Sequence, residues 1–185
     1  VHEYLMGERP AMIDLMAWNA DSTRMPYRMH SEYLRDLFLN NDLAEGHFLV
    51  SGRPVALTDI RAPIFAVGAE RDHVAPWKST YKINLQLESE VTYLLASGGH
   101  HAGIVSEPGN PGRSFRVRTK QANQHYLDPE RYVAEARRKD GSWWPEWTAW
   151  LSERSGPPSG TPPMGAPQAG YPLLSDAPGA YVRMQ

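Results

Sequence analysis

Two polar clusters of the sequence contain the residue types of an acid–base pair. The first is Glu70-Arg71-Asp72-His73, and the second is Ser97-Gly98-Gly99-His100-His101. A carboxylate that accepts the Nδ1–H of an imidazole fixes the tautomer of the ring, so that Nε2 can act as a general base toward a nucleophile. Asp72 and His100 are therefore candidate catalytic residues. The alternatives are a turn or helix-capping role for Asp72 and an ordinary loop position for His100.

Each cluster follows a segment that is typical of a buried strand. Residues 64–69 and 91–96 are short apolar runs without clean alternation, as expected for strands covered on both faces. The residues between them contain a predicted helix over 77–87, which favours two parallel neighbours in a βαβ unit. Ligands bind beyond the carboxyl ends of such strands, and adjacent strands lie about 4.8 Å apart. The two loops are thus expected to bring an Asp and a His into contact.

The rest of the sequence predicts further helices and turns. A polar loop over 14–26 leads into a helix with an apolar stripe, and a hairpin is expected over 48–57. A long Gly- and Pro-rich loop is expected over 98–113, followed by helices that begin at Asp128 and Ser142. The last helix places its tryptophans on one broad face, which favours packing in the core or at an interface over a binding patch.

The composition fits a soluble globular chain and excludes several classes of function. The 185 residues include 19 Lys and Arg against 21 Asp and Glu, so the net charge of −2 lacks the basic excess that nucleic-acid binding needs. There is no cysteine, and hence no disulfide or cysteine nucleophile in this chain. The adjacent His100 and His101 side chains diverge and have no third ligand at a suitable spacing, so no metal is expected. No apolar run reaches the roughly 20 residues of a transmembrane segment.

The predicted pair lacks a nucleophile. In α/β-hydrolases the chain order is nucleophile, acid and histidine, and the nucleophile lies at a tight turn between glycines, as in G-x-S-x-G. No serine of this chain has that setting. Because the chain begins at Val1 without a helix-start or turn signal, we expect the nucleophile on a preceding segment.

Four motifs of the chain are specific in residue type, order and spacing. They are Trp18-Asn19-x-Asp21-x-Thr23, Asp72-His73-Val74-Ala75-Pro76-Trp77, Gly99-His100-His101-Ala102-Gly103-Ile104-Val105 and Gly141-Ser142-Trp143-Trp144-Pro145. With the ending at 177–182, they resemble the carboxy-terminal part of the polyhydroxyalkanoate synthases, of the single-subunit type that polymerises short-chain 3-hydroxyacyl-CoA. The resemblance covers nearly the whole chain.

The resemblance implies an α/β fold and an acyltransferase activity. The fold would be the carboxy-terminal portion of an α/β-hydrolase fold, a mostly parallel sheet with flanking helices, plus the end of its cap subdomain. Asp72 resembles the catalytic aspartate of the family and His100 its catalytic histidine. In the implied reaction, (R)-3-hydroxyacyl-CoA is polymerised into polyester with release of CoA, which needs no metal and no redox cofactor. The chain alone, without the nucleophilic cysteine, is not expected to polymerise.

Three residues are weaker candidates for contacts with the substrate. Trp18 is expected to brace the cap and the entry to the site, with simple loop anchoring as an equal alternative. For His73, a structural role in the acid loop is favoured over a chemical one. His101 stands where many relatives of the family have an apolar residue or Asn, and a structural or solvated role is favoured over lining the substrate channel.

The expected organisation is the end of the cap over 1–57, the core with both catalytic candidates over 58–154, and a tail over 155–185, where 12 of 31 residues are Pro or Gly. The resemblance implies as partners the hydroxyacyl-CoA, the growing polyester chain, a second copy in a homodimer and the surface of polymer granules in the cytoplasm. Two alternatives stay open: an ester or polyester hydrolase of the same fold with a serine nucleophile, and a non-catalytic module that binds granules or dimerises.

Overall fold

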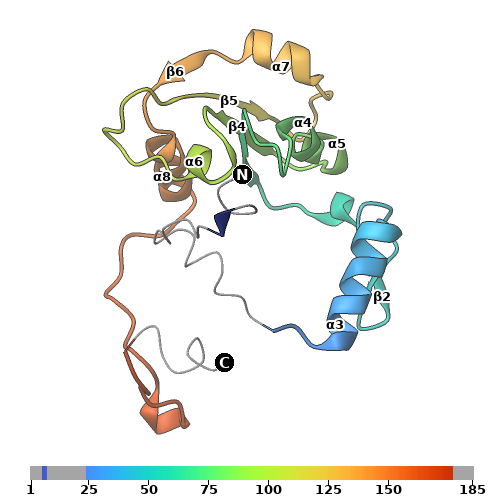
Figure 1. Ribbon diagram of the computed structural model, residues 1–185, viewed down its shortest axis with the longest axis vertical. Coiled ribbons are helices and arrows are strands. Elements are labelled where there is room, and N and C mark those ends of the chain that lie inside the picture. The colour runs from blue at the N-terminus through green and yellow to red at the C-terminus, as the bar shows by residue number, and fades with distance from the viewer. Residues whose placement is uncertain (1–5, 8–23, 177–185) are drawn as a thin grey trace. The chain divides into compact units, whose positions relative to one another are not determined.

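The computed structural model describes residues 6–7 and 24–176. The chain divides into two compact units, one made of Val1–Ser31 with Pro158–Gln185 and the other of Glu32–Pro157. The second unit contains the sheet and both catalytic candidates, and its elements from β1 to α8 are drawn in Figure 1. The expected domain limits at residues 57 and 154 stay a prediction.

The centre of this unit is a four-stranded sheet with the order β3-β4-β5-β6. Its strands are β3 (Ile64–Ala69), β4 (Val91–Ala96), β5 (Ser114–Lys120) and β6 (Arg138–Asp140). β3 and β4 are parallel, as predicted, whereas β5 runs antiparallel to both β4 and β6. The prediction of a mostly parallel sheet is therefore wrong for the described strands, which form a mixed sheet. The reason is that β5 starts beside the end of β4 and returns along it: Ala96 lies opposite Phe115.

The core lies on both faces of the sheet, because successive side chains of β4 point to opposite sides. All six residues of β4 are buried, which confirms the prediction of a strand covered on both faces. One face forms a buried cluster of Tyr81, Tyr93, Leu95, Tyr132 and Ala136. The other face forms a buried cluster of Leu94, Ala96, Phe115 and Trp143. β3, at one edge of the described sheet, is half-buried over Ile64–Val67.

The helices that cover the first face are α4 (Trp77–Thr80), α5 (Ile83–Gln86) and α7 (Pro129–Glu135). The helix predicted over 77–87 is thus two short helices in the crossover between β3 and β4. The predicted start of α7 is confirmed, since the Asp128 carboxylate accepts the N–H of Arg131 at 2.8 Å and Pro129 occupies the first turn.

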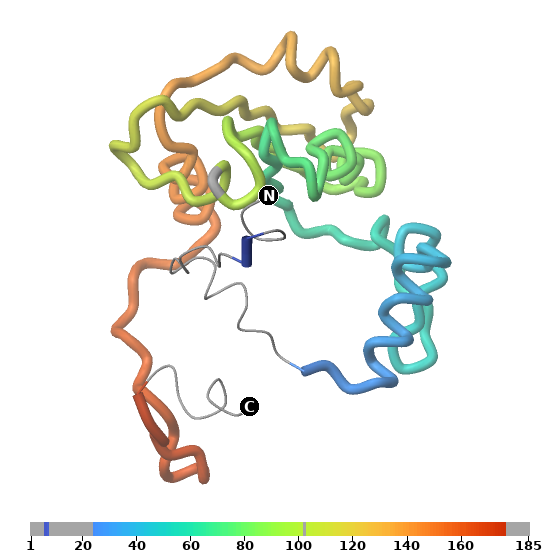
Figure 2. The backbone as a smooth tube through the Cα atoms, in the orientation of Figure 1, coloured from blue at the N-terminus to red at the C-terminus, as the bar shows by residue number. Residues whose placement is uncertain are grey.

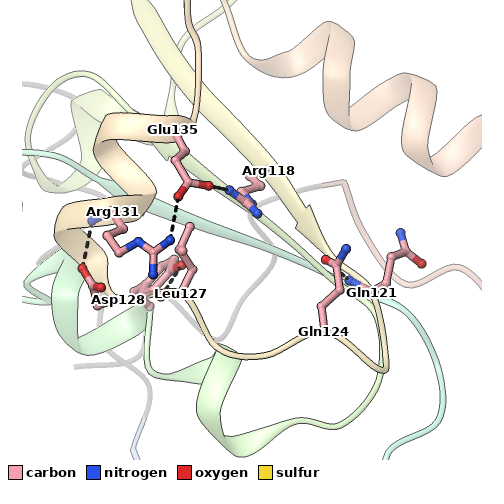
Figure 3. A network of polar contacts seen from close by, with 8 residues as sticks. Arg118, Gln121, Gln124, Leu127, Asp128, Arg131 and Glu135 are labelled. Atoms are coloured by element: carbon pink, nitrogen blue, oxygen red, sulfur yellow. Dashed lines mark hydrogen bonds and ion pairs between the residues drawn. The ribbon is translucent and has the colours of Figure 1, made fainter.

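Cationic side chains of β5 stabilise the ends of these helices. Arg116 donates to the carbonyl of Ala136 at the end of α7, and Lys120 donates to the carbonyl of Leu87 at the end of α5, both at 2.7 Å. Positive charge is favourable at a helix C-terminus, where carbonyls lack helical partners. Arg118, which lies between Arg116 and Lys120 in β5, pairs with Glu135 of α7, as Figure 3 shows. These contacts explain why β5 can have a cationic side chain at every second position and still be part of the central sheet.

The second face is covered by α8 (Trp144–Glu153), which starts two residues later than predicted. Trp143 precedes the helix and is 6% exposed, whereas Trp147 is 43% exposed, so the tryptophans do not share one buried face. Trp150 packs edge-to-face on Phe65 of β3 at 5.6 Å between ring centroids. The path from β6 into α8 can be followed in Figure 2.

The predicted helix after Pro26 and the predicted hairpin are both present. α3 (Tyr27–Glu32) runs directly into the π-helical segment η1 (Tyr33–Leu39), and Phe38 on it is 69% exposed. β1 (Phe48–Val50) pairs antiparallel with β2 (Arg53–Val55) around Ser51-Gly52, whose positive φ angles of 51° and 75° suit a two-residue hairpin turn. A short 3-10 turn, η2 (Leu57–Asp59), follows and leads toward β3.

The described tail is irregular, as expected from its composition. Between Arg154 and Asp176 it contains one short 3-10 turn, η3 (Pro167–Ala169), enclosed by an isolated bridge between Ala166 and Tyr171. Across the described part of the chain, no helix has the length and apolar character needed to span a membrane.

Candidate active site

Asp72 lies three residues beyond β3, in a loop held against the end of β4. The N–H of Glu70 donates to the carbonyl of Ala96 at 2.9 Å, and the N–H of Arg71 donates to that of Gly98 at 2.8 Å. These two bonds continue the parallel pairing past the last strand residues. The loop that carries Asp72 is therefore fixed to the segment that leads into His100.

His100 is the first residue of a short helix, α6 (His100–Ile104), which follows β4. The loop predicted over 98–113 thus contains a helix. Gly98 makes the preceding turn with a φ of +113°, in the region that favours glycine. The side chain of His100 is 37% exposed and that of Asp72 is 8% exposed.

The two side chains meet at the carboxyl ends of β3 and β4. Nδ1 of His100 lies 2.8 Å from Oδ2 of Asp72, so the contact expected between the two loops is present. The other oxygen, Oδ1, accepts the backbone N–H groups of Val74 and Ala75, both at 2.9 Å. Asp72 therefore stabilises a turn, which was the alternative to a catalytic role, and it also pairs with an imidazole. Its role in catalysis stays a prediction.

The surroundings of Asp72 keep it ionised. The N–H of Ala75 lowers its pKa most strongly; partial burial raises the pKa, and His100 and the N–H of Val74 lower it again, to a net value of about 2. An ionised carboxylate only accepts hydrogen bonds, so Nδ1 of His100 must carry the proton between them. Nε2 then has a lone pair for a general base.

The Asp72 carboxyl is expected to titrate at about pH 2 instead of its usual 3.8. A depressed folded-state pKa means that this carboxylate stabilises the fold above pH 3.8, and that the contribution is lost as the pH falls toward about 2. Carboxyl ¹³C NMR measures the midpoint directly. In His100→Ala the midpoint is expected to rise but to stay below 3.8, because the Ala75 N–H remains. A wild-type midpoint near 3.8 would contradict this account of the site.

A close glycine contact places α6 on the end of β3. A Cβ at Gly103 would lie 2.7 Å from the Cβ of Ala69, closer than side-chain atoms normally approach. A Cβ at Gly98 would lie 3.0 Å from the Cα of Gly103. The helix of His100 therefore packs on the strand that leads to Asp72 with no space for a side chain at residue 103.

The weaker candidates receive less support from the structure. His101 is exposed, and its ring lies 4.4 Å from that of His100 between centroids, so the expectation that these adjacent side chains diverge is wrong. His73 is also exposed, beside Asp72 in the acid loop. Trp18 lies outside the described residues. Across residues 6–7 and 24–176, no three His, Asp or Glu side chains are grouped so that they could hold a metal ion.

Sequence reasoning missed the residues that hold α6 in place. All of them contact the C-terminal end of the helix: Ala69 lies against Gly103, and Ser142, Trp143 and Trp144 donate hydrogen bonds to the carbonyls of Ile104 and Ser106. All of them except Ala69 belong to the motifs, but the contacts join segments about 35 to 40 residues apart, which spacing cannot reveal.

Comparisons with known proteins agree with the motifs. No family model matches the chain. The poly(3-hydroxyalkanoate) polymerase of Methylorubrum extorquens is 39% identical to it over 186 residues, covering 100% of the chain and 30% of that protein. The poly(3-hydroxyalkanoate) polymerase 2 of Ectopseudomonas oleovorans is 38% identical, over 98% of the chain and 32% of that protein. The poly(3-hydroxyalkanoate) polymerase subunit of Cupriavidus necator is 34% identical, over 99% of the chain and 30% of that protein.

These matches confirm the resemblance found in the sequence, and they also limit it, because the chain spans about 30% of the length of the curated relatives it matches. Over its whole length, the chain is similar to one portion of the poly(3-hydroxyalkanoate) polymerases.

Proposed function

We propose that this chain is the carboxy-terminal part of a poly(3-hydroxyalkanoate) polymerase and supplies the acid–base pair of its active site on an α/β-hydrolase core. The observation that carries the proposal is the 2.8 Å contact between Asp72 and Nδ1 of His100 at the ends of two parallel strands. The similarity of the whole chain to named polymerases supports the same reading. The end of the cap over 1–57, the core over 58–154 and the tail over 155–185 would be its parts.

In the proposed reaction, His100 is the base for a cysteine thiol on the part of the enzyme outside this chain. Nε2 takes the thiol proton while the sulfur attacks the thioester carbon of (R)-3-hydroxyacyl-CoA. The bond from that carbon to the CoA sulfur breaks, and CoA leaves with the proton from His100. The 3-hydroxyl of another unit then attacks the acyl carbon and gives its proton to the base; the bond from that carbon to the cysteine sulfur breaks, and the base returns the proton to the sulfur as the new ester forms.

Asp72 has two possible tasks in this scheme. It orients His100 and stabilises the protonated ring, or it activates the 3-hydroxyl that attacks the acyl-cysteine. The exchange of thioester, thiol and ester needs no metal and no redox cofactor. A homodimer that works at the surface of a polyester granule completes the proposal.

The complete polypeptide that contains this chain provides the test. We expect it to release CoA from 3-hydroxybutyryl-CoA, measured as free thiol, and to form polyester in proportion. Loss of both on replacing the cysteine of an upstream G-x-C-x-G turn would support the proposal. Hydrolysis of polyester through an upstream serine, with no CoA released, would overturn it in favour of a hydrolase. Granule binding by a wild-type polypeptide that has no turnover, with binding unchanged in Asp72→Asn with His100→Ala, would overturn it in favour of a non-catalytic module.

A further inference from the structure

The helix that carries His100 is too short to hold its own position. α6 has five residues, and isolated helices of that length are not stable in water, because nucleation fixes several residues for few hydrogen bonds. The helix ends at Val105 in an extended conformation, so its last carbonyls have no helical partners. Its placement therefore depends on contacts from elsewhere in the fold.

Three consecutive residues before and at the start of α8 supply donors to that end of α6. Nε1 of Trp143 lies 3.2 Å from the carbonyl oxygen of Ile104, and Nε1 of Trp144 lies 3.0 Å from the same oxygen. The hydroxyl of Ser142 donates to the carbonyl of Ser106. We call Ser142, Trp143 and Trp144 the α6 anchor. Figure 1 shows α6 and α8 next to one another.

The α6 anchor is held in place by packing in the core and by a hydrogen bond within the anchor. Trp143 is 6% exposed and belongs to the buried cluster of β4 and β5, in which it packs with Ala96 and Phe115. Ser142 also accepts the N–H of Trp144 at 3.1 Å, which orders the turn into α8. The carbonyl of Ala96, in the same cluster, accepts the N–H of Glu70 and so helps to hold the loop of Asp72.

The anchor therefore connects both halves of the acid–base pair to one sheet. With a side chain 37% exposed, His100 is not held by a closed shell of neighbours around its ring. The distance of 2.8 Å to Asp72 depends instead on where α6 begins, and this is set by Gly103 against Ala69 and by the indoles at Ile104.

We propose that Trp143 and Trp144 are positioning residues, whose indole N–H groups hold α6 so that His100 meets Asp72. As a statement about catalysis, this inference rests on the proposed function. As a statement about the His100–Asp72 hydrogen bond, it does not. Two indole donors on one carbonyl thus have a role beyond filling the core.

The test compares two kinds of Trp→Phe substitution in the complete polypeptide. Trp143→Phe with Trp144→Phe keeps aromatic packing and removes both hydrogen bonds to Ile104. Trp150→Phe is the matched control, because Nε1 of Trp150 is buried without a hydrogen-bond partner among the described residues while its ring packs on Phe65. The control therefore removes an indole N–H from α8, the helix that begins at Trp144, and leaves the hydrogen bonds to α6 untouched.

Two measurements are made on each variant. The first is steady-state turnover of 3-hydroxybutyryl-CoA, where the double variant is expected to lose about 10- to 100-fold in kcat with KM unchanged, since a small misplacement of a catalytic group has that effect. The second is the Nδ1–H resonance of His100 in ¹⁵N-histidine-labelled protein, assigned with His100→Ala. We expect it to shift toward the solvent-exposed position in the double variant and to stay in place in Trp150→Phe.

A double variant that keeps its kcat and its His100 resonance, or changes no more than Trp150→Phe, would overturn the inference. If the wild-type polypeptide has no turnover, the proposed function fails, and the resonance alone still decides whether the indoles hold His100. Should the double variant not fold, Trp144→Phe provides the test, because Trp144 is only half-buried and one of the two hydrogen bonds is lost. An unchanged His100 resonance and kcat in that variant would equally overturn the inference.

Discussion

Asp72→Asn is expected to lower the kcat of the complete polypeptide by about 10⁴-fold, with little change in KM, as in hydrolytic triads where the carboxylate sets the tautomer of the histidine. Asn presents an NH₂ group that donates to Nδ1 of His100, which leaves the proton on Nε2. A protonated Nε2 on a neutral ring cannot accept the proton of a thiol. The measurement is steady-state release of CoA from 3-hydroxybutyryl-CoA.

His100→Ala should reduce kcat to a similar extent, and the double variant with Asp72→Asn should be no slower than the slower single variant. Residues that act as one unit give non-additive losses, because removing either one already removes the function of both. Additive losses would indicate that the two side chains act in separate steps in spite of their 2.8 Å contact.

The first turnover of Asp72→Asn distinguishes the two tasks open to Asp72. If the carboxylate orients His100, the first release of CoA is slow, because the thiol is not deprotonated. If it activates the 3-hydroxyl, the first release is fast and only elongation is slow. Rapid-quench measurement of CoA released per enzyme separates these results.

Matched controls show that such losses are specific. Asp128→Asn makes the same chemical change at the N-cap of α7, where Asn caps as well as Asp. His125→Ala removes a solvent-exposed histidine between β5 and α7. Both should retain wild-type turnover. Turnover of Asp72→Asn or His100→Ala at the level of these controls would remove the basis of the proposed mechanism.

The second large effect is expected from Gly103→Ala. The added methyl group would lie 2.7 Å from the Cβ of Ala69, so α6 must move away from β3. Overpacking of this kind costs about 1 to 3 kcal/mol. Alanine is also favoured over glycine in a helix by about 1 kcal/mol, which offsets part of that cost. We therefore expect only a modest loss of unfolding free energy. We expect a clear loss of kcat, because Gly103 and His100 belong to the same helix, and moving Gly103 away from Ala69 moves His100 as well.

A compensating substitution checks that mechanism. Ala69→Gly removes the opposing methyl group and should restore turnover to Gly103→Ala, although Ala69→Gly alone weakens β3 by about 0.5 to 1 kcal/mol. Turnover and denaturant unfolding of the four proteins complete the cycle. Equal kcat in Gly103→Ala and wild type, or no recovery in the double variant, would show that the spacing between α6 and β3 does not position His100.

Much of the framework was accessible from local pattern. The two apolar runs at 64–69 and 91–96 have the observed bounds of β3 and β4, and the crossover between them made a parallel pair the natural expectation. The contact of Asp72 with His100 followed, because both residues come shortly after the ends of neighbouring strands. The cap of α7 and the hairpin of β1 and β2 are likewise encoded by a few adjacent residues.

β5 was missed for a physical reason. Its alternation of Arg116, Arg118 and Lys120 with less polar residues is a strand pattern, but three cations suggest a solvated segment when the chain is considered alone. They are accommodated because helix-terminal carbonyls and Glu135 lie opposite them, 17 to 33 residues away in the chain. Without those partners in view, the return of the chain along β4 and the mixed sheet could not be foreseen.

Residue identity and spacing thus defined which groups are available for chemistry and which strand ends carry them, since strand ends and turns depend on near neighbours in the chain. The geometry of the pair came from packing. The 2.8 Å contact of His100 with Asp72 requires α6 to lie at one distance from β3, and that distance is set by Gly103 on Ala69 and by two indoles on Ile104. Such contacts join segments that are far apart in the chain, and they form only when α6 packs against β3 and against the start of α8.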